Sequence, residues 1–266
     1  MLDRVLPARI LRVVGRRLWL DMRGWRSYRA SFWLGVTGDV TWLLFSMVFF
    51  DGIYTRVGEV GGWRWPDVLL LIGTAQLIEG VYSMLFARNV KQLSSGVRSG
   101  SLDRLLLYPA DPQLLLTVGR VDLRGLLTAV LGLTIVFYGL RVGEWRPDAL
   151  QAVLYVFMVV GGVLVRLASA FLIETLSFVF VDIGVIRALQ DEFFGYAAYP
   201  QSVYPGLAWK LVFTIFIPVL WMANLPVSAL RGGAGVAAWL LFPVLLILIS
   251  RLALSFALRG YQSAGG

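Results

Sequence analysis

A chain of 266 residues that is 58% apolar, with a mean hydropathy of +0.76, is too apolar for an ordinary soluble domain, which is about 45–50% apolar. It has no cysteine and no histidine, which excludes disulfides, metal sites built from those residues, and Ser-His or Cys-His nucleophiles. In a chain this apolar, the net charge of +8 indicates contact with anionic lipid headgroups, and we expect no nucleic-acid partner.

The first 30 residues predict an amphipathic helix that lies on the membrane surface. They carry eight arginines, which fall mostly between apolar residues at helical spacing: Leu11, Val14, Leu18, Met22 and Trp25. The segment lacks the charged, apolar and small-residue order of a signal peptide, so we expect it to stay in the mature chain.

The remaining residues, 31–266, predict a membrane domain with six transmembrane helices. Continuous apolar blocks of about 20 residues cross a hydrocarbon layer of roughly 30 Å as helices, because helices pair their own backbone groups. The predicted spans cover about 32–50, 67–87, 113–140, 149–180, 205–221 and 236–258. The fold class is therefore an all-α polytopic membrane protein with an N-terminal interfacial helix.

Two segments near the fifth predicted span are less regular. Residues 182–204 are mixed polar and aromatic, and we interpret them as a connector rather than a span. Within the apolar block that follows, Pro218 and Pro226 remove backbone donors and break the helix. This pattern predicts a span to about Trp221, then a broken or re-entrant segment, Asn224 to Leu230.

The positive charges predict the orientation. Arginine and lysine are concentrated before the first span and in residues 88–112, whereas the loops on the opposite side hold only Arg56, Arg64, Arg141, Arg146 and Arg231. The richer side is expected to face the cytoplasm, so both termini are cytoplasmic.

The stretch between the second and third predicted spans contains a short helix with proline stops. Gly100 and Ser101 favour a helix start, with Asp103 near its positive end. Leu102, Leu105 and Leu106 make one apolar face, and Pro109 and Pro112 stop the helix. Such a helix suits docking into a groove of a soluble partner, or it only anchors the loop at the membrane.

This stretch resembles the cytoplasmic coupling helix of type-2 ABC-transporter permeases, the export class. One bacterial subgroup reads Arg-x-Gly-x-Leu-Asp-x-x-Leu-Leu-x-Pro, which matches Arg98, Gly100, Leu102, Asp103, Leu106, Leu107 and Pro109. The same subgroup has an arginine-rich start, Gly-Trp in the first external loop and a double Tyr-Pro connector, which here are Gly62-Trp63, Tyr199-Pro200 and Tyr204-Pro205.

The resemblance implies a permease subunit in the bacterial cytoplasmic (inner) membrane, paired with a second permease, identical or related, and with two ATP-binding cassette ATPase subunits. Those subunits would dock on the segment Arg98 to Pro109, including Arg104 and Tyr108. It also implies short helices that dip back from the outer face between the fifth and sixth spans, around Pro218 to Gly235.

No cofactor is expected in this chain. A phosphate-cradling Gly-x-x-x-x-Gly-Lys-Ser/Thr loop needs lysine before serine or threonine, but Lys91 precedes Gln92 and Lys210 precedes Leu211. The chain is therefore not expected to be an enzyme, and ATP and Mg²⁺ are expected on the partner subunit.

Ionisable residues at membrane depth form a second candidate site. Each costs about 2.5–3.5 kcal/mol at a helix centre on insertion scales, so each should face protein or water. Gln76 and Glu79 could line a path, and Arg166 needs an acidic partner, for which Glu79 and Glu174 are the candidates. Asp39 belongs to the same group. Arg120, Asp122 and Arg124 are expected to snorkel. Alternatively, such residues only form ion pairs that fix helix packing.

The leading hypothesis is an ABC permease that moves an amphipathic or glycan- or lipid-like substrate. A stand-alone ion-coupled transporter or channel is the alternative, supported by the charges within spans. A membrane-embedded enzyme or scaffold lacks a clustered catalytic set in the sequence. The substrate and the direction of transport are not readable from the residues.

Overall fold

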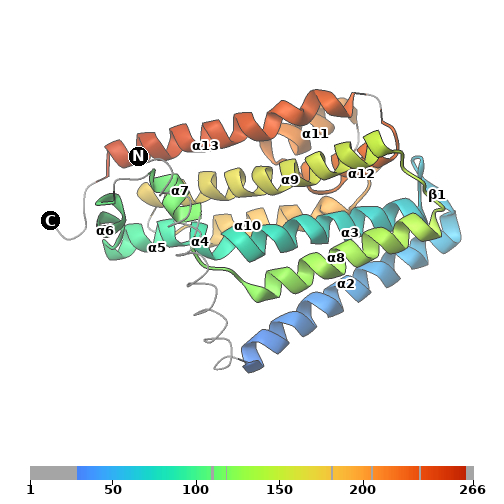
Figure 1. Ribbon diagram of the computed structural model, residues 1–266, viewed down its shortest axis with the longest axis horizontal. Coiled ribbons are helices and arrows are strands. Elements are labelled where there is room, and N and C mark those ends of the chain that lie inside the picture. Colours follow the sequence, from blue (N-terminus) through green and yellow to red (C-terminus); the bar gives the residue numbers. More distant parts are fainter. Residues whose placement is uncertain are drawn as a thin grey trace, which may run out of the picture.

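The computed structural model describes residues 29–108, 111–117, 119–180, 182–204, 206–233 and 235–261. Long helices lie side by side in one bundle, and a small two-stranded sheet lies at one end of it (Figure 1). We call this end the hairpin end, and the opposite end, which carries a short helix after residue 100, the α6 end. The predicted interfacial helix lies outside the described residues except for its last two positions.

The long helices are α2 (Arg29–Val57), α3 (Trp65–Tyr82), α8 (Leu123–Val142), α9 (Ala149–Thr175) and α13 (Phe242–Arg259). The shorter ones are α4 (Arg88–Val90), α5 (Gln92–Ser99), α6 (Leu102–Leu106), α7 (Pro112–Thr117), α10 (Gly184–Gly195), α11 (Gly206–Leu211) and α12 (Asn224–Leu230). Strands β1 (Glu59–Val60) and β2 (Trp63–Arg64) pair antiparallel.

Three aspartates fix where long helices begin. Asp67 accepts a hydrogen bond from the Arg64 backbone N–H at 2.9 Å, at the start of α3. Asp122 accepts from Arg124 N–H at 3.0 Å before α8, and Asp148 accepts from Gln151 N–H at 2.8 Å before α9. A carboxylate at these positions satisfies backbone donors that the helix itself leaves free.

Within the described residues, five helices are long and apolar enough to cross a membrane: Phe32–Val57, Trp65–Ser99, Leu123–Val142, Ala149–Phe178 and Val236–Arg259. The expectation of an all-α polytopic membrane protein is confirmed. Several boundaries differ from the predicted ones. The first helix continues to Val57, through residues that we expected in a loop, and the second runs on to Ser99 through a π-helix (Ser83–Ala87), α4 and α5. The third begins at Leu123 rather than near residue 113, because α7 is a separate helix.

The predicted fifth span, 205–221, is not a continuous helix. The six residues of α11 and the five of a π-helix (Val212–Phe216) rise only about 16 Å. The chain then breaks at Pro218 and continues as a 3₁₀ helix (Val219–Met222) and α12. Trp221 is buried against Gly161 and Gly162 in the middle of α9, and the Arg231 side chain donates to Gly62 O at the hairpin end.

The segment 182–204, interpreted from the sequence as a connector, instead runs the length of the bundle. Near its start, Arg187 donates to Ser94 of α5, and near its end, Ser202 donates to the Val60 carbonyl of β1. It consists of α10 and two 3₁₀ helices, Tyr196–Ala198 and Gln201–Val203. The buried Asn224 side chain pairs with backbone groups of Gln201 and Tyr199 at 2.7 and 3.0 Å, which satisfies the irregular backbone.

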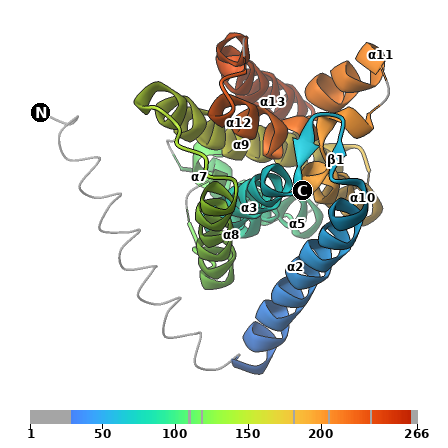
Figure 2. The same cartoon turned by 90° about the vertical axis from the view of Figure 1, so that its right-hand side faces the viewer.

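Helix α3 lies in the middle of the bundle and α2 at its edge (Figure 2). Backbones of α3 and α8 touch: an added Cβ at Gly80 would lie 2.2 Å from Ala129 N, and one at Gly132 would lie 2.4 Å from Leu77 N. Helix α2 packs on α3 near the hairpin end, through Phe50 and Tyr54, and diverges from it toward its own N-terminal end (Figure 1). This divergence positions the candidate site.

Candidate functional site

A cavity of about 740 Å³ opens between α2, α3, α8, α9 and α10. All five intramembrane residues singled out from the sequence line it: Asp39, Gln76, Glu79, Arg166 and Glu174. On α3 and its continuation the lining runs from Ile72 to Lys91, about 28 Å of helix at 1.5 Å per residue. The cavity therefore follows most of the thickness of a hydrocarbon layer.

Arg166 of α9 is the centre of a network on one wall. Its Nε donates to Glu79 Oε2 at 3.0 Å, its Nη2 to Asp191 Oδ1 at 2.5 Å and its Nη1 to Gln190 Oε1 at 3.3 Å. The rings of Tyr82 and Phe194 lie 4.4 and 4.6 Å from its Cζ atom. The Arg166 side chain is only 4% exposed, whereas those of Glu79 and Asp191 are 37% and 47% exposed. The carboxylates, not the guanidinium, therefore meet the cavity.

Of the two acidic partners predicted for Arg166, only Glu79 pairs with it. Glu174 is instead paired with Arg187 of α10, at 2.6 Å, and Arg187 also donates to Ser94 Oγ at 3.0 Å. The other carboxylate oxygen of Glu174, Oε2, is buried and accepts no hydrogen bond from the described residues. Sequence reasoning missed Asp191 and Arg187 because both lie in the segment taken for a connector.

The opposite wall carries an ion pair between α2 and α8. Arg124 donates from Nε to Asp39 Oδ2 at 2.7 Å and from Nη2 to Oδ1 at 2.6 Å, a two-bond geometry that fixes both side chains. Asp122 lies 3.4 Å from Arg88, and the backbone N–H of Arg120 donates to the buried Asn89 side chain at 2.7 Å. Arg124 and Asp122 each have a partner within the chain, and that they snorkel stays a prediction.

Aromatic side chains line the cavity toward the hairpin end. Trp42, Phe45 and Phe49 of α2 form a column with centroids 6.0 and 6.3 Å apart. Phe50 meets Tyr199 edge to face at 5.2 Å. The cavity is therefore charged along its middle and toward the α6 end, and aromatic toward the hairpin end.

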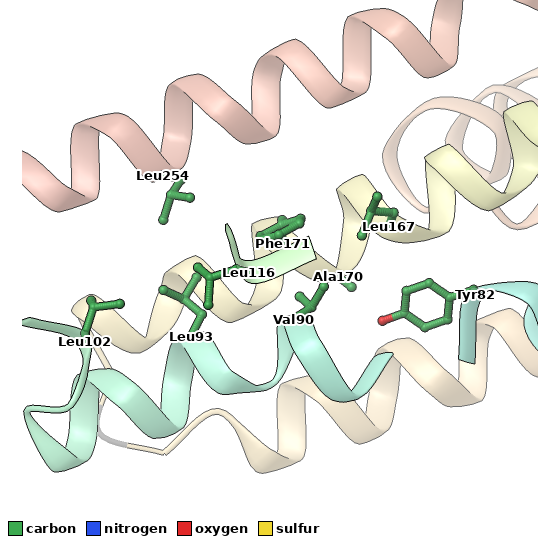
Figure 3. Packing of buried hydrophobic residues seen from close by; sticks show 9 residues of the cluster. All are labelled: Tyr82, Val90, Leu93, Leu102, Leu116, Leu167, Ala170, Phe171 and Leu254. Carbon is green, nitrogen blue, oxygen red and sulfur yellow. The ribbon is translucent and has the colours of Figure 1, made fainter. Parts of the chain in front are cut away.

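Helix α6 forms the second candidate site. Gly100 ends α5 at φ +67°, a conformation that glycine adopts without strain, and α6 follows at Leu102–Leu106. Leu102 is 2% exposed and packs with Leu93, Leu116, Phe171 and Leu254 (Figure 3). α6 is therefore anchored on four other helices.

The predicted single apolar face of α6 is divided in the structure. Leu105 packs beside Leu102, but Leu106 lies at the exposed edge, and Leu107 and Tyr108 just beyond the helix are 83% and 65% exposed. The three leucines share one helix face by their spacing, but α6 is only five residues long, and only Leu102 and Leu105 lie over the core. Large apolar side chains in water are a mark of an interaction surface.

Some polar residues around α6 contact other parts of the chain, and others are exposed. Arg98 lies 4.0 Å from Asp182, and Arg104 is exposed. Burial and the neighbouring Asp103 carboxylate raise the pKa of Tyr261. Pro109 lies outside the described residues.

Among the described residues there is no group of three or more His, Cys, Asp or Glu that could hold a metal ion. The family model described as "ABC-2 family transporter protein" matches residues 40–265. The chain belongs to the ABC-2 transporter family. It is thus a type-2 ABC transporter permease, a multi-pass membrane component of a transport system whose family works with ABC ATPase subunits. The alternative of a stand-alone transporter or channel is not favoured. No curated protein and no solved structure matches the chain.

In this ABC-2 permease, α6 and the cavity are joined by a short series of contacts. Leu102 of α6 packs on Gly96 and Leu93 of α5. Ser94, on the same helix, accepts a hydrogen bond from Arg187, and Arg187 is paired with the cavity-lining Glu174. A displacement of α6 would therefore act on α5, on α10 and on the wall of the cavity.

Proposed function

We propose that this chain is the transmembrane subunit of an ATP-driven exporter, which moves an amphipathic or glycan- or lipid-like substrate across the bacterial cytoplasmic membrane. The observation that carries the proposal is the cavity itself. It combines paired charges, aromatic rings and a length of about 28 Å along α3, which suits a molecule with a polar and an apolar part.

The ATPase subunits dock on α6 and its flanks. Leu106, Leu107 and Tyr108 supply the exposed apolar contacts, and Arg98 and Arg104 supply charge around them. ATP and Mg²⁺ are held by those subunits. Closure of the ATPases displaces α6, and the contacts from Leu102 through Ser94 and Arg187 transmit the displacement to the cavity.

A second permease, identical or related, completes the path. In one chain α2 forms a wall of the cavity, and it also exposes large apolar side chains that do not line the cavity, among them Trp33, Leu34, Leu44 and Val48. These side chains face lipid or a partner chain.

The permease crosses the membrane six times, with both termini in the cytoplasm. The crossings are the five long helices and the segment 184–203, whose contacts run from Ser94 to Val60. Residues 206–233 then form a re-entrant excursion from the outer face. The α6 end carries Arg88, Lys91, Arg98 and Arg104, so it faces the cytoplasm.

Thiol labelling tests the fifth crossing directly, because the chain has no cysteine of its own. We expect Val203→Cys to react with a membrane-impermeant maleimide in cells in which the outer face of the cytoplasmic membrane is accessible to the reagent. Glu59→Cys on β1 should react in the same way. Ser95→Cys on α5 should react only after permeabilisation. If Val203→Cys behaves like Ser95→Cys, the assignment of 184–203 as a crossing is wrong.

Co-purification tests the proposed function. The tagged chain, isolated in mild detergent from cells that express it, should bring down an ABC ATPase subunit, identified by mass spectrometry. A chain that purifies without any ATPase, from membranes in which it is functional, would sink the proposal.

A further inference from the structure

We infer that the substrate carries a positive charge: the cavity is built to bind an organic cation with an aromatic or otherwise apolar body. This inference rests on the proposed function for its meaning in transport. Its evidence is the number and position of the charged side chains on the cavity walls.

The wall formed by α3, α9 and α10 has one carboxylate more than it has guanidiniums. Glu79, Glu174 and Asp191 face only Arg166 and Arg187. The opposite wall is neutral, since Asp39 pairs with Arg124 and Asp122 with Arg88. The remaining cation of the lining, Lys91, lies at the α6 end, three turns of helix from Glu79. The middle of the cavity therefore keeps one negative charge.

The negative side chains in the middle of the cavity are also more accessible than the positive one. Arg166 is enclosed by Tyr82, Phe194 and its own partners, so an anion in the cavity does not reach it. The carboxylates of Glu79 and Asp191 remain more than a third exposed.

The aromatic residues complete the site. Trp42, Phe45 and Phe49 of α2 line the same cavity as the carboxylates, and their rings lie nearly parallel to one another. Ring faces attract cations and pack against apolar groups, so a carboxylate with aromatic neighbours favours organic cations over anions of the same shape. A volume of about 740 Å³ is within the range of sites for drug-sized molecules.

Binding of two probes of equal shape and opposite charge tests the inference on the purified permease without any ATPase. We expect tetraphenylphosphonium to bind more tightly than tetraphenylborate in equilibrium dialysis. Asp191→Asn, which keeps an acceptor for Arg166, and Glu79→Gln should each weaken tetraphenylphosphonium binding by at least about tenfold. Glu192→Gln, the next residue of α10 and not part of the lining, should bind like the wild type.

The inference is overturned if the wild type prefers tetraphenylborate, if neither probe binds, or if Asp191→Asn and Glu79→Gln leave the affinity unchanged. The wild-type comparison needs no variant, so it holds even where a substitution impairs folding. A chain that prefers the cation but never associates with an ATPase contradicts the proposed function alone. A chain that associates with an ATPase but prefers the anion contradicts this inference alone.

Discussion

Arg166→Ala is expected to destabilise the permease by about 3 kcal/mol, the lower end of the range for removing one partner of a buried ion pair. The substitution leaves Glu79 and Asp191 without their common cation at membrane depth, and both carboxylates then repel each other. The lower end applies because these carboxylates are partly exposed to the cavity. The midpoint of thermal unfolding in detergent, followed by tryptophan fluorescence, measures the loss.

Two further variants separate charge from packing. Arg166→Met combined with Glu79→Gln and Asp191→Asn removes all three charges, and we expect it to recover much of the lost stability, since a neutral network has no unpaired charge to bury. Arg141→Ala, a change of an exposed arginine at the end of α8, should leave the midpoint unchanged. If Arg166→Ala unfolds at the wild-type temperature, the network does not stabilise this fold.

Leu107→Asp is expected to reduce the amount of ATPase that co-purifies with the permease by at least about tenfold, because burying a leucine at an interface contributes about 1.5–3 kcal/mol. Leu107 is 83% exposed, so the substitution removes no contact of the isolated chain, and its thermal unfolding should not change. Quantitative immunoblotting of the ATPase in the purified complex gives the ratio.

The matched control is Val57→Asp, which makes the same kind of change at an exposed apolar position of the hairpin end. It should leave ATPase association intact. Equal losses for Val57→Asp and Leu107→Asp, or no loss for Leu107→Asp, would exclude the surface around α6 as the docking site.

The apolar blocks predicted all five long helices: the last two (149–180 and 236–258) closely, and the first three with errors of about seven to twelve residues at one end. The pattern from Arg98 to Pro109 predicted a short helix, and α6 occupies Leu102–Leu106. These features are local: length, apolarity, glycine and proline determine them. That one side of α6 is buried and the other exposed was not predictable, because the burial depends on Leu93, Leu116 and Leu254 from three other helices.

That the segment 184–203 runs the length of the bundle was not predictable from hydropathy. One side of it packs on protein and lines the cavity, so it tolerates Arg187, Asp191 and two 3₁₀ turns. Its irregular backbone is satisfied by Asn224, which lies in an apolar block that resembles a span in the sequence. An asparagine among apolar residues was the one signal in the sequence that this block hydrogen-bonds to the backbone of another segment.

The cavity was predictable in part. The cost of charges at membrane depth singled out Asp39, Glu79, Arg166 and Glu174, and all four line the cavity. Their partners were not predictable. Arg124 pairs with Asp39, and Arg187 with Glu174, only because of how α2 and α10 pack in the bundle.

Transport in proteoliposomes tests the central claim most directly. The permease is reconstituted with its co-purified partners, and uptake of cationic, anionic and neutral fluorescent amphipaths is measured with ATP. We predict that uptake of at least one amphipath requires ATP and stops when the phosphate-binding lysine of the ATPase is replaced by alanine, and that the permease alone transports nothing under an ion gradient. Uptake by the permease alone, driven by that gradient, would contradict the account.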